Sequence, residues 1–399
     1  MGARDPRLPA HRHGQEEAVR PARQHAHDDV LEPLAPRGGR TAGGRLVPTV
    51  ARRPPFRGAV VRAAVLKEFG AAPVVEEVAE PPCGPSDVLV RTSAAGVCQT
   101  DVKIVDGLVP TVELPRVPGH EIAGEVAELG RDVTGFSEGE RVLVSLDVSC
   151  ESCRYCLIGK FDYCEALRRV GFEQDGGWAD LVRVPARNLL AVPDGVTLAE
   201  AATIPDAVGS PYHAVVGRAG VRVGDVVAVY GLGGLGLAAV QIARVAGARV
   251  IAIARTPERR ELAEQLGASW SIDPRDGPVG EQVRELTDGL GVDAFFDVVG
   301  AEGTVEQGVL ACRKGGQVVI VGYVVPEVSA PTVGLVYGEV SIRGSRSSTR
   351  DELERATRLV AERRVTPVIG RELGLDEVGR ALEELRSGTV IGRPVLTLP

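Results

Sequence analysis

The sequence lacks several features that define other classes of protein. No run of apolar residues approaches the ~18 that a membrane-spanning helix requires. No basic segment followed by an apolar stretch and a small-residue cleavage site marks an export leader. The formal net charge of −8 gives no overall basic surface for nucleic acid. We therefore expect a protein that acts neither in a membrane nor on nucleic acid.

Lysine is also scarce, since only four of the 46 basic residues are lysine, and we interpret this as a coding bias. The length of 399 residues exceeds what one core usually organises, which predicts two domains. Four of the seven cysteines fall within fifteen residues at metal-ligand spacing. Thiolates that bind metal fit a reducing compartment better than disulfides do, so we expect a cytoplasmic protein.

Residues 1–58 differ from the rest of the chain. They are rich in Arg, Pro, Gly and His and show no sustained apolar periodicity, which predicts a disordered tail. Because VRAAVLKEFG, from Val61, looks like a natural amino terminus, a second hypothesis is that this tail does not belong to the natural protein. Four histidines of the tail are possible metal ligands, although a solvated tail is the simpler interpretation: His11, His13, His25 and His27.

The hydrophobic pattern changes twice after the tail. From Val60, short alternating or β-branched runs broken by Gly and Pro predict an antiparallel, barrel-like domain. Apolar strands then alternate with amphipathic helices, as in VVAVYG followed by LGLAAVQIARVAG, which predicts a doubly wound parallel sheet. Two helices and a closing strand, GRPVLTLP, come last, and we expect that strand to return to the first domain. The predicted fold class is α/β with two domains.

A glycine-rich segment follows the first predicted strand of the parallel sheet. Gly231, Gly233 and Gly236 form a G-x-G-x-x-G pattern between that strand and a predicted helix. These glycines permit a tight turn, close approach of a pyrophosphate and close helix–strand packing. We therefore predict a dinucleotide site at the helix N-terminus. Its predicted residues are Gly231, Leu232, Gly233, Gly234, Leu235 and Gly236.

The end of the next predicted strand bears on the choice between NAD and NADP. NAD-selective sites usually place Asp or Glu there to bind the ribose hydroxyls. This chain has Ala254 followed by Arg255. A guanidinium can pair with a 2′-phosphate, so the sequence favours NADP, although Arg255 in solvent and use of either cofactor remain open.

Four cysteines of the segment CESCRYCLIGKFDYC have the spacing of a metal site, C-x2-C-x2-C-x7-C. They are Cys150, Cys153, Cys156 and Cys164. Four thiolates close a tetrahedral shell around zinc and leave no open position. The segment therefore predicts a structural zinc site, which by itself does not indicate an enzyme.

A second group of candidate ligands is dispersed along the chain. AAGVCQTD contains Cys98 and Thr100, VPGHEIAGEV contains His120 and Glu121, and ATIPDAVGSPYHAV contains Asp206. Taken singly, a histidine is more often structural than a ligand, and a cysteine is often a small buried hydrophobe.

In order and spacing, these segments resemble the zinc-dependent medium-chain alcohol dehydrogenases from about Val61 to Pro399. The resemblance implies a GroES-like catalytic domain and a Rossmann cofactor domain inserted into it. It also implies that Cys98 and His120 bind a catalytic zinc with Glu121 beside it, and that Thr100 relays the substrate proton. Ser210 resembles a position near the nicotinamide. The implied divisions are 1–58 (tail), 59–207 (catalytic domain, first part), 208–344 (Rossmann domain) and 345–399 (returning catalytic part).

The sequence departs from the family pattern at two positions. Most members have Cys as the third ligand where this chain has Asp206, although a carboxylate is a competent zinc ligand and keeps the same formal charge. The alternative is that Asp206 only caps the following helix, which leaves the catalytic metal weak or absent. Many members also have a histidine five residues past the first ligand, where this chain has Lys103, so the outer proton route is not specified.

The sequence therefore predicts a zinc-dependent oxidoreductase with one catalytic and one structural zinc, which transfers hydride between a small alcohol or carbonyl compound and NADP or NAD. One alternative is a zinc-independent quinone or enoyl reductase on the same fold, and another is a non-catalytic, zinc-stabilised binding protein. The PDAVGSPYHAV segment resembles that of bacterial dehydrogenases that act on hydroxylated cyclic acyl-CoA esters, which indicates one class of substrate. The family resemblance implies a homodimer or homotetramer.

Overall fold

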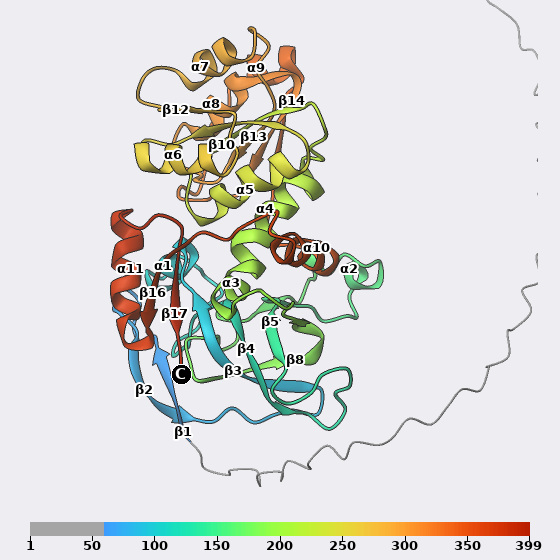
Figure 1. The fold of residues 1–399 in the computed structure, drawn as a ribbon, viewed down its shortest axis with the longest axis vertical. Coiled ribbons are helices and arrows are strands. Elements are labelled where there is room, and N and C mark those ends of the chain that lie inside the picture. Colours follow the sequence, from blue (N-terminus) through green and yellow to red (C-terminus); the bar gives the residue numbers. More distant parts are fainter. Residues whose placement is uncertain (1–59) are drawn as a thin grey trace, which may run out of the picture. The chain divides into compact units, whose positions relative to one another are not determined.

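The computed structural model describes residues 60–399 (Figure 1). The predictions for residues 1–58, including the four histidines and the hypothesis about the tail's origin, lie outside the described residues. Among residues 60–399, no helix combines the length and the apolar character needed to cross a membrane. Two large sheets organise this part of the chain, and two short strand pairs accompany them.

The first large sheet has seven strands in the order β16-β17-β3-β4-β5-β9, with β8 also paired to β3. All its pairings are antiparallel except that of β16 with β17. Its strands are β3 (Asp87–Gly96), β4 (Glu121–Leu129), β5 (Arg141–Val144), β8 (Leu181–Pro185), β9 (Leu189–Ala191), β16 (Ile369–Gly374) and β17 (Arg393–Thr397). The separate pairs are β1 (Val60–Val65) with β2 (Val74–Ala79), and β6 (Asp147–Val148) with β7 (Arg168–Arg169).

The register around β3 brings three distant segments to one end of this sheet. Gly96, the last residue of β3, pairs with Glu121 of β4 and with Val395 of β17. The chain therefore leaves β3, enters β4 and enters β17 at the same end of the sheet. Strand pairing alone thus gathers the candidate ligands after β3 and before β4 with the start of the C-terminal strand.

The second large sheet has six parallel strands in the order β12-β11-β10-β13-β14-β15. In order of sequence this is 3-2-1-4-5-6, the arrangement of doubly wound dinucleotide-binding folds, whose ligands bind where the strand order reverses. Its strands are β10 (Val226–Tyr230), β11 (Arg249–Ile253), β12 (Trp270–Ile272), β13 (Val292–Asp297), β14 (Cys312–Ile320) and β15 (Ser341–Gly344). Its helices are α5 (Gly234–Val245), α6 (Pro257–Gln265), α7 (Val279–Leu286), α8 (Thr304–Ala311) and α9 (Thr332–Gly338).

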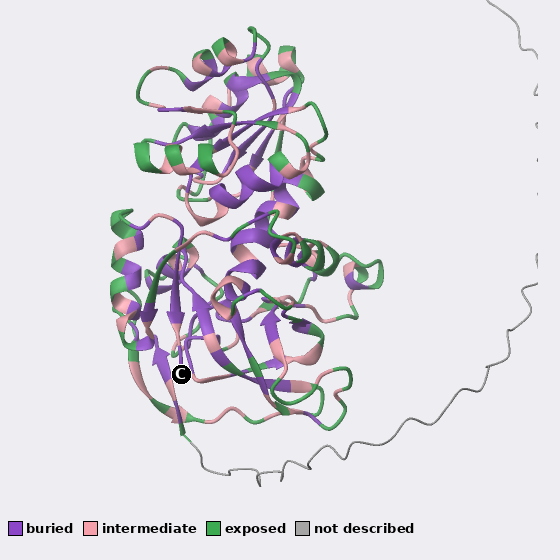
Figure 2. Cartoon of the chain, viewed as in Figure 1, coloured by how far each residue is buried: buried purple, intermediate pink, exposed green. Residues whose placement is uncertain are grey.

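Alternate residues of β10 face two different cores, because side chains of a strand point to opposite faces of its sheet. Val227 and Val229 belong to one buried cluster, whereas Val226 and Ala228 belong to another. The central strands β10, β11 and β13 of this sheet are buried on both faces, as Figure 2 shows. This burial explains why they appear in the sequence as continuous apolar runs.

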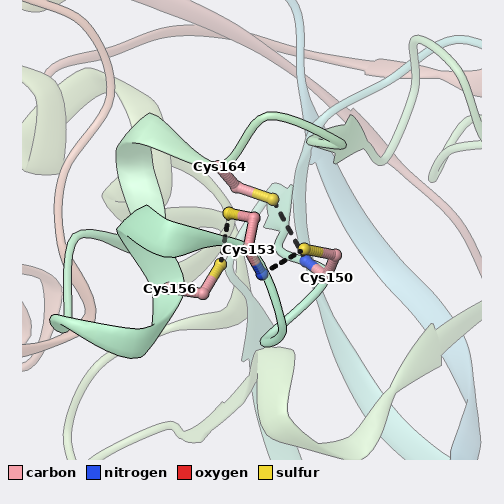
Figure 3. Close-up of side chains that lie close together, drawn as sticks. All are labelled: Cys150, Cys153, Cys156 and Cys164. Atoms are coloured by element: carbon pink, nitrogen blue, oxygen red, sulfur yellow. Dashed lines mark hydrogen bonds between the residues drawn. The ribbon is translucent and has the colours of Figure 1, made fainter.

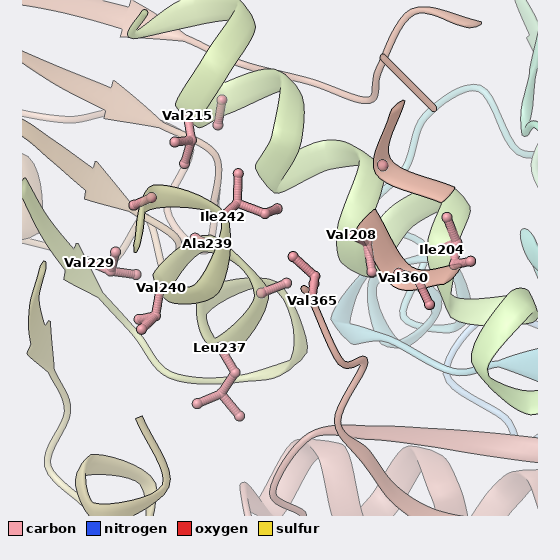
Figure 4. Close-up of a cluster of buried hydrophobic side chains, with 14 of the residues drawn as sticks. Ile204, Val208, Val215, Val229, Leu237, Ala239, Val240, Ile242, Val360 and Val365 are labelled. Carbon is pink, nitrogen blue, oxygen red and sulfur yellow. The ribbon is translucent and has the colours of Figure 1, made fainter. Parts of the chain in front are cut away.

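The helical segment η3 (Ile204–Val208) and the helix α10 (Arg350–Ala361) share one core with both sheets (Figure 4). Ile204 and Val208 from this segment lie in the same buried cluster as Leu237 of α5 and Val360 of α10. The remaining helical elements are α1 (Gln99–Val105), α2 (Arg154–Leu157), η1 (Phe161–Tyr163), η2 (Ala186–Asn188), α3 (Leu198–Thr203), η3 (Ile204–Val208), α4 (Gly209–Tyr212), η4 (His213–Arg218), α10 (Arg350–Ala361), η5 (Leu375–Glu377) and α11 (Val378–Ser387).

The predicted fold class is confirmed: an antiparallel sheet accompanies a doubly wound parallel sheet. The two helices expected near the C-terminus are α10 and α11. A feature that the periodicity did not indicate is that η3 and η4 are π-helical turns. Such turns are rare and frequently occur at functional sites.

Candidate active site

Cys98 is held by the start of helix α1. It is the N-cap residue in an extended conformation, and its Sγ accepts a hydrogen bond from the Thr100 N–H at 3.2 Å. The Asp101 Oδ2 accepts from the Cys98 N–H at 2.8 Å, which completes a capping box. The positive end of a helix favours negative charge on the sulfur. The local sequence C-Q-T-D therefore fixes the position of a potential thiolate ligand.

His120 precedes β4 and faces Cys98 across the end of the sheet. Its Nδ1 lies 3.2 Å from Asp101 Oδ1, and its Nε2 lies 3.4 Å from Cys98 Sγ. A carboxylate on one ring nitrogen fixes the tautomer that leaves the other nitrogen free for a metal. Asp101 was not among the predicted site residues. The final D of the segment AAGVCQTD was the signal that could have identified it.

Asp206 lies in the π-helical turn η3. Its Oδ2 is 4.0 Å from His120 Nε2, and its Oδ1 accepts a hydrogen bond from the Ser210 hydroxyl at 2.8 Å. Within residues 60–399, the Asp206 carboxylate makes no capping bond to the backbone of the helix that follows. One donor atom from each of Cys98, His120, Glu121 and Asp206 lies within 4.8 Å of the others.

Glu121 presents a buried carboxylate to this cluster. Neither of its oxygens has a hydrogen-bond partner among the described residues. Arg393 Nε of β17 lies 3.1 Å from Glu121 Oε1, and Arg393 Nη2 donates to Asp206 Oδ2 at 3.2 Å. Sequence reasoning missed Arg393, because nothing in GRPVLTLP indicates that its first charged side chain reaches residues so far away in the sequence.

The electrostatics of the cluster suit a bound cation. Burial raises the pKa of the Cys98 thiol and of the Glu121 carboxyl, and Arg393 only partly opposes the effect on Glu121. Burial acts in the same direction on Asp206, but the charges of Arg393 and His120 outweigh it and lower the pKa of that carboxyl. Sulfur, imidazole and carboxylate donors together are a ligand set that zinc accepts. The donor set and the unbonded carboxylate oxygens of Glu121 therefore fit a divalent metal.

The four cysteines of the predicted structural site converge on one point (Figure 3). The Cys153 and Cys156 sulfurs are 3.5 Å apart, and the Cys150 and Cys153 N–H groups donate to the sulfurs of Cys164 and Cys150 at 3.2 Å and 3.4 Å. Hydrogen bonds from the Ser152 backbone and side chain lower the pKa of Cys150 to about 6, which favours its thiolate. The lobe fits a closed four-sulfur zinc site.

The glycine loop has the geometry expected of a dinucleotide site. Gly231 has a φ of +98°, which a residue with a Cβ rarely adopts. A Cβ on Gly236 would lie 1.8 Å from the Gly231 carbonyl oxygen, whereas a Cβ on Gly233 would meet no atom within 4 Å. The turn and the helix packing thus require the outer two glycines, while the middle one leaves the backbone open. A Cβ on Gly234 would lie 3.3 Å from Arg393 Cζ, so this guanidinium also packs on the loop.

Two family descriptions match the chain. The description "Zinc-binding dehydrogenase" matches residues 234–362, and "Alcohol dehydrogenase GroES-like domain" matches residues 84–194. An alcohol dehydrogenase of Geobacillus stearothermophilus is 34% identical over 84% of this chain and 99% of that relative. The chain belongs to the zinc-binding dehydrogenase family. The predicted family and the predicted class of enzyme are confirmed.

Solved structures of similar proteins agree with this assignment. The alcohol dehydrogenase of the archaeon Aeropyrum pernix has a TM-score of 0.80 and 36% identity, covering 84% of this chain and 100% of that one. A zinc-binding dehydrogenase of Sinorhizobium meliloti 1021, solved bound to NADP, has a TM-score of 0.80 and 30% identity, covering 85% and 100%. The present dehydrogenase is a zinc-dependent, NAD(P)-linked oxidoreductase of the alcohol dehydrogenase type.

The remaining predicted residues of this dehydrogenase surround the two sites. Arg255 is exposed just past β11. Burial lowers the pKa of the half-buried Arg259, and the positive charge of Arg255 lowers it further. Thr100 lies in the first turn of α1, and Ser210 is buried against Asp206. Lys103, at the second departure from the family pattern, donates from Nζ to the backbone oxygen of Tyr323 at 2.9 Å.

Proposed function

We propose that Cys98, His120 and Asp206 hold the catalytic zinc of this enzyme, with Glu121 beside it. The convergence of these four donors within 4.8 Å is the observation that supports the proposal. When bound, zinc lowers the pKa of an alcohol and polarises a carbonyl group. The chain's own residues then orient the metal ligands, move a proton and position the cofactor.

Asp101 and Thr100 have distinct tasks in this proposal. The Asp101 carboxylate holds His120 by Nδ1 and Cys98 by its backbone N–H, so one side chain orients two ligands. Thr100 stands two residues past Cys98 in the first turn of α1, and its hydroxyl would relay the alcohol proton. Its Oγ1 would accept that proton while it gives up its own to the cofactor ribose or to water. A bound nicotinamide would supply the hydride donor or acceptor for the substrate carbon.

The cofactor occupies the carboxyl edge of the parallel sheet in this proposal. The loop from Gly231 to Gly236, with Leu232, Gly234 and Leu235, offers the N-terminus of α5 to the pyrophosphate. Ser210 lies near the nicotinamide. Arg255, which has no ion-pair partner among residues 60–399, recognises the 2′-phosphate, so NADP is the preferred cofactor. Cys150, Cys153, Cys156 and Cys164 hold a second zinc that stabilises their lobe.

The domain organisation follows from the same assignment. We infer a cofactor domain over residues 208–344, inserted between catalytic parts at 59–207 and 345–399. Pairing of β17 with β3 in one sheet supports this division, because it joins the beginning and the end of the described chain. The substrate is a small alcohol or carbonyl compound. We further propose a homodimer or homotetramer in the cytoplasm, where the thiolates stay reduced.

The decisive experiment is zinc content per chain by elemental mass spectrometry, combined with turnover of an alcohol and aldehyde panel. We expect two zincs in the wild type, one in Asp206→Ala, and two again in Asp206→Cys, which restores an anionic ligand. Ser210→Ala is the matched control, because it removes the hydroxyl bonded to Asp206 and leaves the carboxylate. One zinc in the wild type and in Asp206→Ala alike would refute Asp206 as a ligand.

A further inference from the structure

Lys103 makes two contacts with Tyr323, which follows strand β14 of the parallel sheet. It lies in α1, the helix that Cys98 caps, and its Nζ donates to the Tyr323 backbone oxygen at 2.9 Å. The same nitrogen lies 3.2 Å from the centroid of the Tyr323 ring. A cation over the face of an aromatic ring is attracted by the ring's quadrupole. Lys103 therefore contacts both the backbone and the side chain of Tyr323.

The loop that carries Tyr323 is fixed to the parallel sheet on its other side. The Gly322 N–H donates to the Asp297 oxygen at 3.0 Å, and the Val324 and Val325 N–H groups donate to the Gly300 oxygen at 2.9 Å and 3.0 Å. Tyr323 follows β14 at the carboxyl edge of the sheet, where doubly wound folds bind their ligands. Lys103 thus links the metal-binding helix to an anchored part of the cofactor sheet.

Tyr323 also lines a cavity of about 330 Å³, together with Tyr163, His213, Ser345 and others. Its side chain is half-exposed, since its relative accessibility is 52%. Burial raises the pKa of its phenol, and a hydrogen bond with the Thr100 side chain partly opposes that shift. Tyr323 therefore both lines this cavity and contacts α1 through Lys103.

We propose that Lys103 is a positioning residue that holds Tyr323 against α1 and thereby fixes the side of the 330 Å³ cavity that Tyr323 lines. The space that Tyr323 leaves in this cavity then selects substrates by size. This inference rests on the proposed catalytic cluster for its effect on substrates, but the contact itself is independent of it.

The charge of Lys103 strengthens both contacts. Burial lowers the pKa of Lys103 to about 8, and the Cys98 thiol at the start of the same helix opposes that shift. Tyr323 faces Lys103 from the cofactor sheet, and Arg169 from the antiparallel part acts on the phenol of Tyr323. The cationic form exists below that pKa, so Lys103 holds Tyr323 most firmly at neutral and acidic pH.

The scarcity of lysine makes the contact directly observable, because the chain has only Lys67, Lys103, Lys160 and Lys314. Protein labelled with [ε-¹³C]lysine should give four ε-methylene signals. We expect the Lys103 signal, assigned by its loss in Lys103→Met, to be shifted upfield by the ring current of Tyr323. Tyr323→Leu should return it to the region of the other three. Four overlapping signals in the folded wild type would overturn the proposal, whether or not the protein turns over any substrate.

Steady-state kinetics tests the consequence. Lys103→Met should raise KM for a small alcohol about 3- to 10-fold with a smaller change in kcat, and should improve relative use of bulkier alcohols. Lys103→Arg should preserve the wild-type preference between small and bulkier alcohols, because a guanidinium also donates to a carbonyl and stacks on a ring.

Lys67→Met is the control, since Lys67 pairs with the Glu76 side chain at 2.6 Å and makes neither contact. Equal size preference in Lys103→Met and Lys67→Met would reject the role in specificity. Absence of turnover in the wild type would instead reject the proposed function and leave the signal test intact.

Discussion

Arg393, six residues before the end of the described chain, lies 3.1 Å from Glu121, the residue that follows the candidate ligand His120. The guanidinium is only 5% exposed, and it also donates to Asp206 at 3.2 Å and packs on Gly234 of the glycine loop. One cation thus contacts the metal cluster and the cofactor loop together. Arg393 reaches this position because it begins strand β17, which pairs with β3.

Arg393→Met should leave two buried carboxylates without their cation. Removing one partner of a buried ion pair costs about 3–5 kcal/mol, so we expect a loss of that order in the free energy of unfolding, with a lower zinc content. Arg371→Met is the control, because Arg371 pairs with Glu384 at a half-exposed position where a loss of about 0–1 kcal/mol is expected. Denaturant unfolding of both variants measures the difference, and equal stabilities would contradict the central role of Arg393.

The glycine loop offers a pair of variants with opposite consequences. Gly236→Ala places a Cβ 1.8 Å from the Gly231 oxygen and should destabilise the fold by about 1–3 kcal/mol. Gly233→Ala meets no atom of the protein within 4 Å, so it should fold normally but obstruct the pyrophosphate. We expect its cofactor KM to rise by about 10-fold or more. Thermal unfolding and cofactor titration separate the two effects, and normal cofactor binding by Gly233→Ala would place the pyrophosphate elsewhere.

Arg255→Ala should weaken NADP binding and leave NAD binding nearly unchanged. A hydrogen bond to a charged group contributes about 1.5–3 kcal/mol, which corresponds to a rise in KM for NADP of about 10- to 100-fold. Arg249→Ala serves as the control, because Arg249 is exposed at the other end of β11 and lies over the Trp270 ring. A strong preference of the wild-type enzyme for NADH would contradict this prediction before any variant is made.

The His213–Glu352 pair should make stability sensitive to acid. Burial alone would raise the pKa of Glu352, but hydrogen bonds from His213 at 2.9 Å and from the Thr349 N–H at 2.8 Å outweigh it and lower that pKa. The unfolded chain, with a Glu pKa of about 4.3, then binds the proton more readily than the folded one. The contribution is therefore present above about pH 4.3 and is lost as the pH falls through the lower folded value.

Glu352→Gln should accordingly reduce the dependence of the melting temperature on pH between about 5 and 3. Glu354→Gln is the control on the same helix, because Glu354 makes an exposed pair with Arg350 at 3.2 Å. Melting curves across that range measure the effect. If Glu352→Gln and Glu354→Gln show the same slope as the wild type, the pair contributes nothing to acid sensitivity.

The features that the sequence determined by itself are those whose partners are close along the chain. The loop from Gly231 to Gly236 and the lobe from Cys150 to Cys164 each obey a spacing that local backbone geometry enforces. The alternation of strands and helices likewise follows from side-chain periodicity, which needs no distant contact. For the same reason, the capping box of Cys98 and Asp101 was already present in four consecutive residues. The second contact of Asp101, with His120, was not visible in the sequence.

The contacts of Arg393 with Glu121 and of Lys103 with Tyr323 were decided only by the tertiary structure. Both join residues more than 200 positions apart. Which side chains meet at such separations depends on strand register and on the packing of two sheets around a shared core. No local pattern encodes that register, because a shift of one residue would leave each short motif intact while it moved every side chain to the opposite face.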